Sequence, residues 1–184
     1  LSTSLPDTNA PTLSGVSIAS NNPTNTLAKS GNDITLSFTA SEEIGTPAVT
    51  FQSGGAAVMD SSVVYSNTSG NTWTAVYTAN PSDTDGVVTY SIAFSDIAAN
   101  AGTPVTSGSG SVTIDTTVPT LSDVSISSNN TNRSMATPTD VVTLSFTASE
   151  TIQSPTVTAS SGGAAVNSNV SVSNKSGNTW TASF

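Results

Sequence analysis

The side chains of this chain that could do chemistry are almost all oxygen donors. Cysteine and histidine are absent, and 12 acidic residues face only three lysines and arginines, giving a net charge of −9 over 184 residues. The chain therefore has no disulfide, no thiolate nucleophile and no histidine general base. Three cations are too few to grip nucleic acid or an anionic membrane. We accordingly expect a non-enzymatic protein whose side chains suit hard cations such as Ca²⁺.

Carboxylates and amides near the joins between domains are the candidate Ca²⁺ ligands. Asp96 and Asn100 fall in the last long loop of the first repeat, which we expect to lie near the end where Asp115 leaves for the next domain. A carboxylate of the following repeat would complete this joint, and Asp7 would serve the preceding joint. The alternative is that these residues only make turns, because Asp and Asn side chains bond to nearby backbone. The predicted ligands are Asp7, Asp96, Asn100, Asp115, Asp123 and Glu150.

Other suggestive residues have a structural explanation. Glu42 and Glu43 are adjacent, so in a strand they would point to opposite faces and make a poor catalytic pair. Residues 83–86 resemble half of an EF-hand loop without its distal Glu, and are more typical of a tight turn. Trp73 and Trp180 could stack on sugars, but each is in phase with the inward residues of its strand, so we expect core positions.

Five asparagines match the acceptor pattern Asn-x-Ser/Thr for N-glycans. In a chain so rich in Asn and Ser some matches arise by chance. Glycans at these sites would shield polar faces and would indicate an extracellular location. The candidate positions are Asn67, Asn129, Asn132, Asn169 and Asn174.

The elements that must position these residues are repeated along the chain. Residues 11–22 recur as residues 119–130, and residues 34–44 recur as residues 142–152. The offset is 108 residues for these blocks and 107 residues for later ones, so one residue is lost near residues 59–62. A period of about 100 residues is the size of a domain, so the chain is a string of similar domains.

Within each repeat the apolar residues alternate with Ser and Thr. Ile34, Leu36 and Phe38 all point one way, and the same period of two runs through the rest of the repeat. This spacing is typical of half-buried antiparallel strands, and no segment has a sustained helical period. About seven such strands in about 105 residues predict an all-β fold of tandem immunoglobulin-like β-sandwiches.

The joins between the repeats define the expected domains. We assign residues 1–8 to a leader or to the tail of a preceding repeat, residues 9–115 to the first sandwich and residues 116–184 to the second. Phe184 aligns with Tyr77, so the second sandwich is incomplete and lacks counterparts of residues 78–114. Because half a sandwich exposes its core, either the sequence is an excerpt of a longer array or a neighbouring subunit donates the missing strands.

Three blocks carry a resemblance to a known family. Thr-Leu-Ser-Phe-Thr-Ala-Ser-Glu at residues 35–42, the loop at residues 94–102 and the join at residues 115–120 resemble the tandem Ig-like repeats of giant prokaryotic cell-surface proteins. That family includes bacterial adhesins and the S-layer proteins of some archaea. The resemblance implies that the domains act as rigid spacers or as the building units of a lattice, commonly stiffened by calcium at the joins between domains. The family's usual loop reads Asp-x-x-Gly-Asn, and Ala99 stands here at the position of the glycine.

These observations together predict a structural function outside the cell. We expect a repeat segment of an S-layer or extracellular filament, associated with the cell surface or cell wall and assembling with copies of itself in a lattice or fibre. The alternative is a stalk that holds the binding domain of a large bacterial adhesin away from the cell. Carbohydrate binding by these domains ranks third. We expect no nucleic-acid partner and no membrane insertion by this segment.

Overall fold

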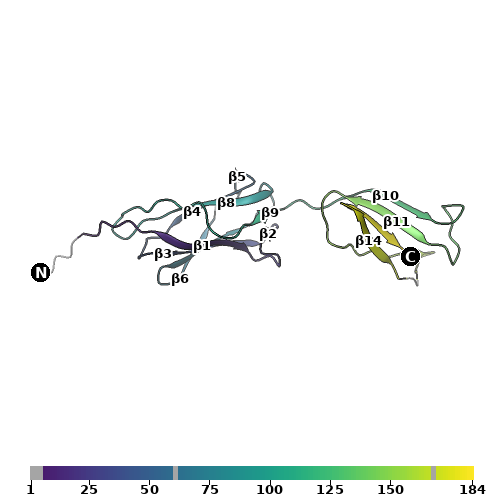
Figure 1. The fold of residues 1–184 in the computed structure, drawn as a ribbon, viewed down its shortest axis with the longest axis horizontal. Coiled ribbons are helices and arrows are strands. Elements are labelled where there is room, and N and C mark those ends of the chain that lie inside the picture. The colour runs from purple at the N-terminus through teal and green to yellow at the C-terminus, as the bar shows by residue number, and fades with distance from the viewer. Residues whose placement is uncertain (1–5, 60–61, 167–168) are drawn as a thin grey trace. The chain divides into compact units, whose positions relative to one another are not determined.

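The chain folds entirely into strands and loops within the residues that its computed structural model describes, namely 6–59, 62–166 and 169–184. No helix long and apolar enough to cross a membrane occurs in these ranges. The strands belong to two compact units, Leu1–Thr117 and Val118–Phe184, which we call unit 1 and unit 2 (Figure 1). The predicted all-β sandwich fold is confirmed. Residues 1–5 of the expected leader lie outside the described residues.

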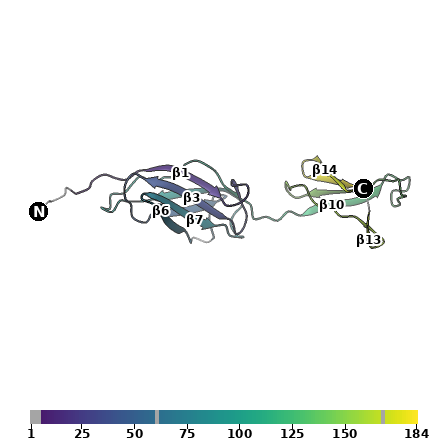
Figure 2. The same cartoon turned by 90° about the horizontal axis from the view of Figure 1, so that it is seen from below.

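Unit 1 is a sandwich of two sheets, and Figure 2 views it from the side of the first sheet. Among the described residues of unit 1, neighbouring strands are antiparallel except for one short parallel pair, β2 with β9. The first sheet has the order β1 (Leu13–Ser20), β3 (Asp33–Ala40), β7 (Thr72–Thr78) and β6 (Val64–Ser69). The second sheet has the order β2 (Leu27–Ala28), β9 (Thr113–Ile114), β8 (Gly86–Ala93), β4 (Ala48–Ser53) and β5 (Ala56–Ala57).

The core of unit 1 lies between these two sheets. Along β3 the side chains alternate strictly between partly exposed and buried, as the period of two predicts. Ile34, Leu36 and Phe38 of β3 are at most 1% exposed, and Ile92 and Ile114 of the opposite sheet are completely buried. Each sheet therefore covers the apolar face of the other, which makes the burial of β3 depend on strands about 50–80 residues further along the chain.

Unit 2 reproduces the first of these sheets, strand for strand. In both units the first two strands pair in the same register, since Leu13 lies opposite Ala40 and Leu121 lies opposite Ala148. Among the described residues, the second sheet is represented in unit 2 only by a short hairpin. The strands of unit 2 are β10 (Leu121–Ser128), β11 (Val142–Ala148), β15 (Thr179–Ser183) and β14 (Ser171–Ser176), with the hairpin of β12 (Ser160–Ser161) and β13 (Ala164–Ala165).

A β-bulge interrupts the first strand of each unit at the same place. The register shifts between Ser14 and Ser17 in unit 1, and correspondingly between Ser122 and Ser125 in unit 2. The extra residue has a positive φ in both units, 60° for Gly15 and 51° for its counterpart Asp123. Asp is one of the few residues other than glycine that enters the left-handed region readily. The bulge therefore gives Asp123, one of the predicted ligands, a role in backbone conformation.

Candidate functional site

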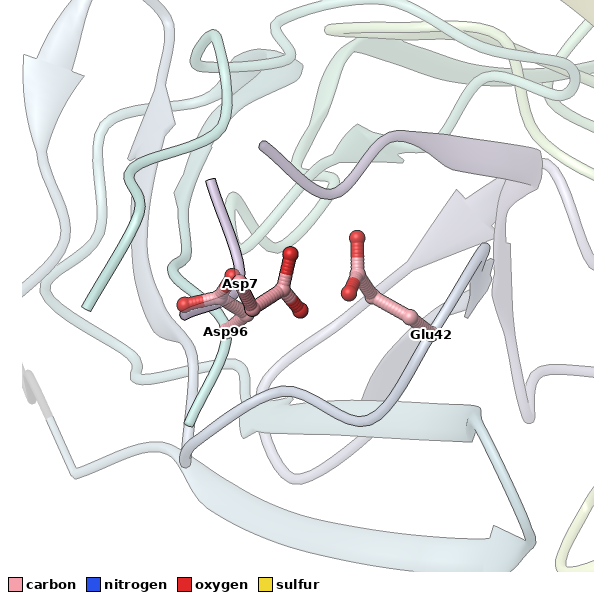
Figure 3. Close-up of side chains that lie close together, drawn as sticks. All are labelled: Asp7, Glu42 and Asp96. Carbon is pink, nitrogen blue, oxygen red and sulfur yellow. The ribbon is translucent and has the colours of Figure 1, made fainter. Parts of the chain in front are cut away.

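Three carboxylates converge at one end of unit 1. Asp7 precedes β1, Glu42 follows β3 and Asp96 follows β8, and each contributes one oxygen to a group whose members lie within 4.8 Å of one another (Figure 3). Oxygens that share one Ca²⁺ at about 2.4 Å can be no more than about 4.8 Å apart. The cluster is therefore compact enough for all three side chains to contact a single cation.

Asp96 is the most firmly positioned member of the cluster. Its side chain is only 5% exposed, and its backbone forms an isolated antiparallel bridge with Ile44. The backbone N–H of Asn100 donates to its Oδ1 at 2.7 Å, and the Asn100 side chain donates Nδ2–H to its Oδ2 at 2.7 Å. The loop from Asp96 to Asn100 thus closes on its own carboxylate.

The residue before Asn100 allows this loop to close. Ala99 has a φ of 71°, and its N–H donates to the backbone carbonyl of Asp96 at 3.2 Å. A positive φ is the conformation for which glycine is ordinarily selected. Ala99 therefore holds a backbone turn that glycine would adopt more easily, at the conformational cost of a Cβ atom.

Asn100 also ties the entering chain to this loop. Its Nδ2 donates to the backbone carbonyl of Asp7 at 3.1 Å, in addition to its bond to Asp96. The Asp7 side chain accepts from the backbone N–H of Asn9 at 3.0 Å. Of the predicted ligands, the structure therefore brings Asp7, Asp96 and Asn100 together, with Asn100 positioning the other two.

Glu42 is the member of the cluster that was not among the predicted ligands. Partial desolvation, and then the neighbouring carboxylates of Asp7 and Asp96, raise the pKa of Glu42 above its ordinary value. The sequence held a signal for it, because Glu42 precedes the predicted ligand Glu150 by the repeat offset of 108 residues, as Asp7 precedes Asp115. The mutual repulsion of the three carboxylates would be relieved by a bound cation or a proton.

The expected grouping of Asp96 and Asn100 with Asp115 does not occur within unit 1. Asp96 follows the Ala93 end of β8, whereas Asp115 follows β9, which pairs with the Gly86 end of that strand. The eight residues of β8 separate the two ends by about 25 Å. The expectation that the loop lies near the exit of the chain was therefore wrong.

The remaining predicted ligands are not members of this group of three carboxylates. Asp115 accepts from the backbone N–H of Thr117 through its Oδ1 at 3.1 Å, as a turn residue does. Glu150 lies just after β11, where Glu42 lies after β3. Asp123 is the bulge residue, and its Oδ2 accepts from the Ser122 hydroxyl at 3.3 Å. The 184 residues hold no counterpart of Asp96 for unit 2.

An anchor for the chain leaving unit 1 was missed by the sequence reasoning. The Asp85 carboxylate accepts from the Thr116 backbone N–H at 2.7 Å, from the Thr116 hydroxyl at 2.9 Å and from the Thr117 hydroxyl. These bonds, first that from Thr117, lower the pKa of Asp85. Nothing in the sequence relates Asp85 to residues more than 30 positions away, because the contact depends on the β8–β9 pairing.

The neighbouring Asp83 stabilises the turn before β8. Its side chain is 5% exposed and accepts from the backbone N–H groups of Asn80 at 2.8 Å and Met59 at 2.9 Å. The Tyr77 hydroxyl also donates to it. Protein donors thus engage this carboxylate, as is typical of a buried turn residue.

The tryptophans lie in corresponding strands of the two units. Trp73 of β7 is opposite Phe38 and packs against the core of unit 1, while Trp180 of β15 is opposite Phe146 and is 8% exposed. These are packing positions, as their phase predicted.

The five glycosylation candidates are all exposed. Asn67 and Asn174 lie on the equivalent strands β6 and β14, while the other three lie in loops. The Asn174 side chain donates to the Gly177 carbonyl at 2.8 Å, and Asn129 accepts through Oδ1 from the Val141 N–H at 2.9 Å. Their exposure leaves them accessible to a modifying enzyme.

Comparison with known proteins adds one structural similarity. No protein-family model and no curated protein sequence matches the chain. Among solved structures, the chain is similar to the titin domains Z1Z2 in complex with telethonin, with a TM-score of 0.34 and 16% sequence identity. The match covers 96% of this chain and 82% of that chain.

Proposed function

We propose that this chain is a structural, non-catalytic segment of an extracellular assembly, an S-layer or a surface filament in which it associates with copies of itself. Repeated all-β units in an acidic chain with few apolar residues at strand outer faces, as in unit 1, are suited to this use. The observation that carries the proposal is the convergence of Asp7, Glu42 and Asp96 at the point where the chain enters unit 1.

A cation at this cluster would stiffen the entrance to the sandwich. Asp7 belongs to the segment before β1, whereas Glu42 and Asp96 belong to loops of the sandwich itself. A Ca²⁺ ion that bound all three would crosslink the entering chain to the domain and neutralise their repulsion. Repetition of such a joint in an array of domains would turn a flexible string into a stiff rod, which both a lattice and a fibre require.

The calcium part of the proposal is tested by titrating the full chain with Ca²⁺. A ligand at 100 times its Kd stabilises the folded state by about 2.7 kcal/mol, and we expect an increase of this order in unit 1. Glu42→Gln should abolish the calcium response while leaving the metal-free unit at least as stable, because the substitution removes a repelling carboxylate. Glu43→Gln, at the exposed neighbouring position, is the matched control and should retain the response.

An unchanged unfolding free energy of the wild-type chain on addition of millimolar Ca²⁺ would contradict the calcium site. Equal calcium responses of Glu42→Gln and Glu43→Gln would contradict its location. The assembly part is tested separately by imaging the native cell surface. A periodic sheet or fibre built from this chain supports it, whereas isolated fibrils tipped by another domain would point to an adhesin stalk.

A further inference from the structure

Unit 2 exposes an apolar sheet face that is covered in unit 1. Ile18 of β1 is 5% exposed, but its counterpart Ile126 of β10 is 65% exposed. Ala28 is 2% exposed, whereas its counterpart Ala136 is exposed. The residues themselves are the same in the two units, so the difference comes from what lies over them. In unit 1 the cover is the second sheet.

The uncovered face forms the floor of a groove of about 490 Å³. Ile126, Val142 and Phe184 belong to the strands and chain end of the four-stranded sheet, while Ala136 and Ser160 lie on the two sides of the groove. The counterparts of these two sides in unit 1 are β2 and β4, and the sheet order there is β2-β9-β8-β4. The groove therefore occupies the place of two strands, a gap of about 14 Å between β2 and β4 at about 4.8 Å per strand.

One side of the groove is residues 156–161, a segment that lacks the neighbouring strand its counterpart has in unit 1. In unit 1, β4 is extended over six residues and pairs along its whole length with β8, with Val49 opposite Ile92 and Phe51 opposite Tyr90. Residues 156–161 have the same alternation, but only Ser160 and Ser161 are in a strand, and they pair with β13. Backbone groups at residues 156–159 are consequently without the ladder that β8 provides in unit 1.

We propose that this groove binds a polypeptide segment that adds two strands to unit 2. The first strand has the apolar alternation of β8 and pairs antiparallel with residues 156–161. The second resembles β9 and pairs parallel with residues 135–136, as β9 does with β2. A small apolar ligand or a second flat sheet could cover Ile126, but neither would supply the backbone partners that the strand edge requires. The groove lies within unit 2, and its occupant is independent of the calcium cluster of unit 1.

The test adds a labelled peptide of residues 79–115 to the full chain and measures binding by fluorescence anisotropy. We expect saturable binding of one peptide per chain and slowed amide hydrogen exchange at residues 156–159. The control peptide carries Ile92→Asp, at a position completely buried in unit 1, and should bind at least about tenfold more weakly. Because this change is in the peptide, it cannot act by unfolding the chain.

A matched pair of chain variants locates the binding. Ile126→Asp places a charge on the floor of the groove and should abolish binding, whereas Ser127→Asp places it on the opposite face of the same strand and should not. The proposal is overturned if the wild-type and Ile92→Asp peptides bind equally, or if neither binds. A third result would also overturn it. The chain would form a dimer that Ile126→Asp dissociates, and the amides of residues 156–159 would exchange as fast in that dimer as in the monomer, which means that Ile126 is covered without a strand pairing with this edge.

Discussion

Ile18 and Ile126 offer a test of how far burial, and not local sequence, determines the contribution of a residue to stability. They occupy equivalent positions in β1 and β10, within segments that pair in the same register, but they are 5% and 65% exposed. Replacing Ile by Ala removes three carbon groups, worth about 2.4 kcal/mol of burial at about 0.8 kcal/mol each, and leaves a cavity where the site is enclosed. We therefore expect Ile18→Ala to lower the free energy of unfolding of unit 1 by about 2–4 kcal/mol. Ile126→Ala should cost unit 2 less than about 1 kcal/mol.

The chain provides one tryptophan in each unit for this measurement. In a Trp180→Phe background the fluorescence of Trp73 reports the unfolding of unit 1, and in a Trp73→Phe background Trp180 reports unit 2. Each alanine variant is compared with its own background by urea denaturation, and the slope of the transition checks that the folded state has not changed. Equal losses in the two units, or a loss above about 2 kcal/mol for Ile126→Ala, would refute the reasoning from burial.

Two further predictions concern the anchor of the linker and a glycine turn. The hydrogen bonds that the Asp85 carboxylate accepts should persist above pH 3.8, the ordinary pKa of Asp, and should be lost as the pH falls through the lowered pKa of Asp85. Protection of the Thr116 amide from hydrogen exchange measures this loss. Asp85→Asn should reduce the same protection at neutral pH. Protection that is independent of pH and of the substitution would show that Asp85 does not hold the linker. Gly54→Ala should destabilise unit 1 by about 2–4 kcal/mol, because its φ is +57° and the new Cβ would lie 2.5 Å from the Asp85 carbonyl oxygen. Gly162 has a similar positive φ but open space around it, so Gly162→Ala should cost only about 1 kcal/mol. Equal shifts of the denaturation midpoint for the two variants would contradict the contribution of the contact with the Asp85 carbonyl.

The candidate site was predictable in its parts and not in its assembly. The oxygen-rich composition and the positions of the loops and joins identify Asp7, Asp96 and Asn100, and the repeat offset from Glu150 points to Glu42. The direction of β8 determines which of these residues lie close together, because one end of β8 is near the segment that enters unit 1 and the other is near the segment that leaves it. That direction brings the end of β8 to the entering chain, and the exit at Asp115 to the other end of the unit.

The sequence by itself determined the strands of the four-stranded sheets and their repetition. Alternating side chains and turn residues act over a few positions, so Ile34, Leu36 and Phe38 specify an inward face wherever the second sheet lies. The bulge likewise recurs with Gly15 in one unit and Asp123 in the other, because both residues tolerate a positive φ.

Only the tertiary structure decided which of these faces is buried and which edges are paired. The alternation of β4 is kept in residues 156–161, but it yields a complete strand only where β8 supplies its hydrogen bonds. Ile18 is likewise buried and Ile126 exposed because the covering strands come from a distant part of the chain. Burial and sheet hydrogen bonding join residues that are far apart in sequence, and a local pattern carries no information about whether the partner is in place.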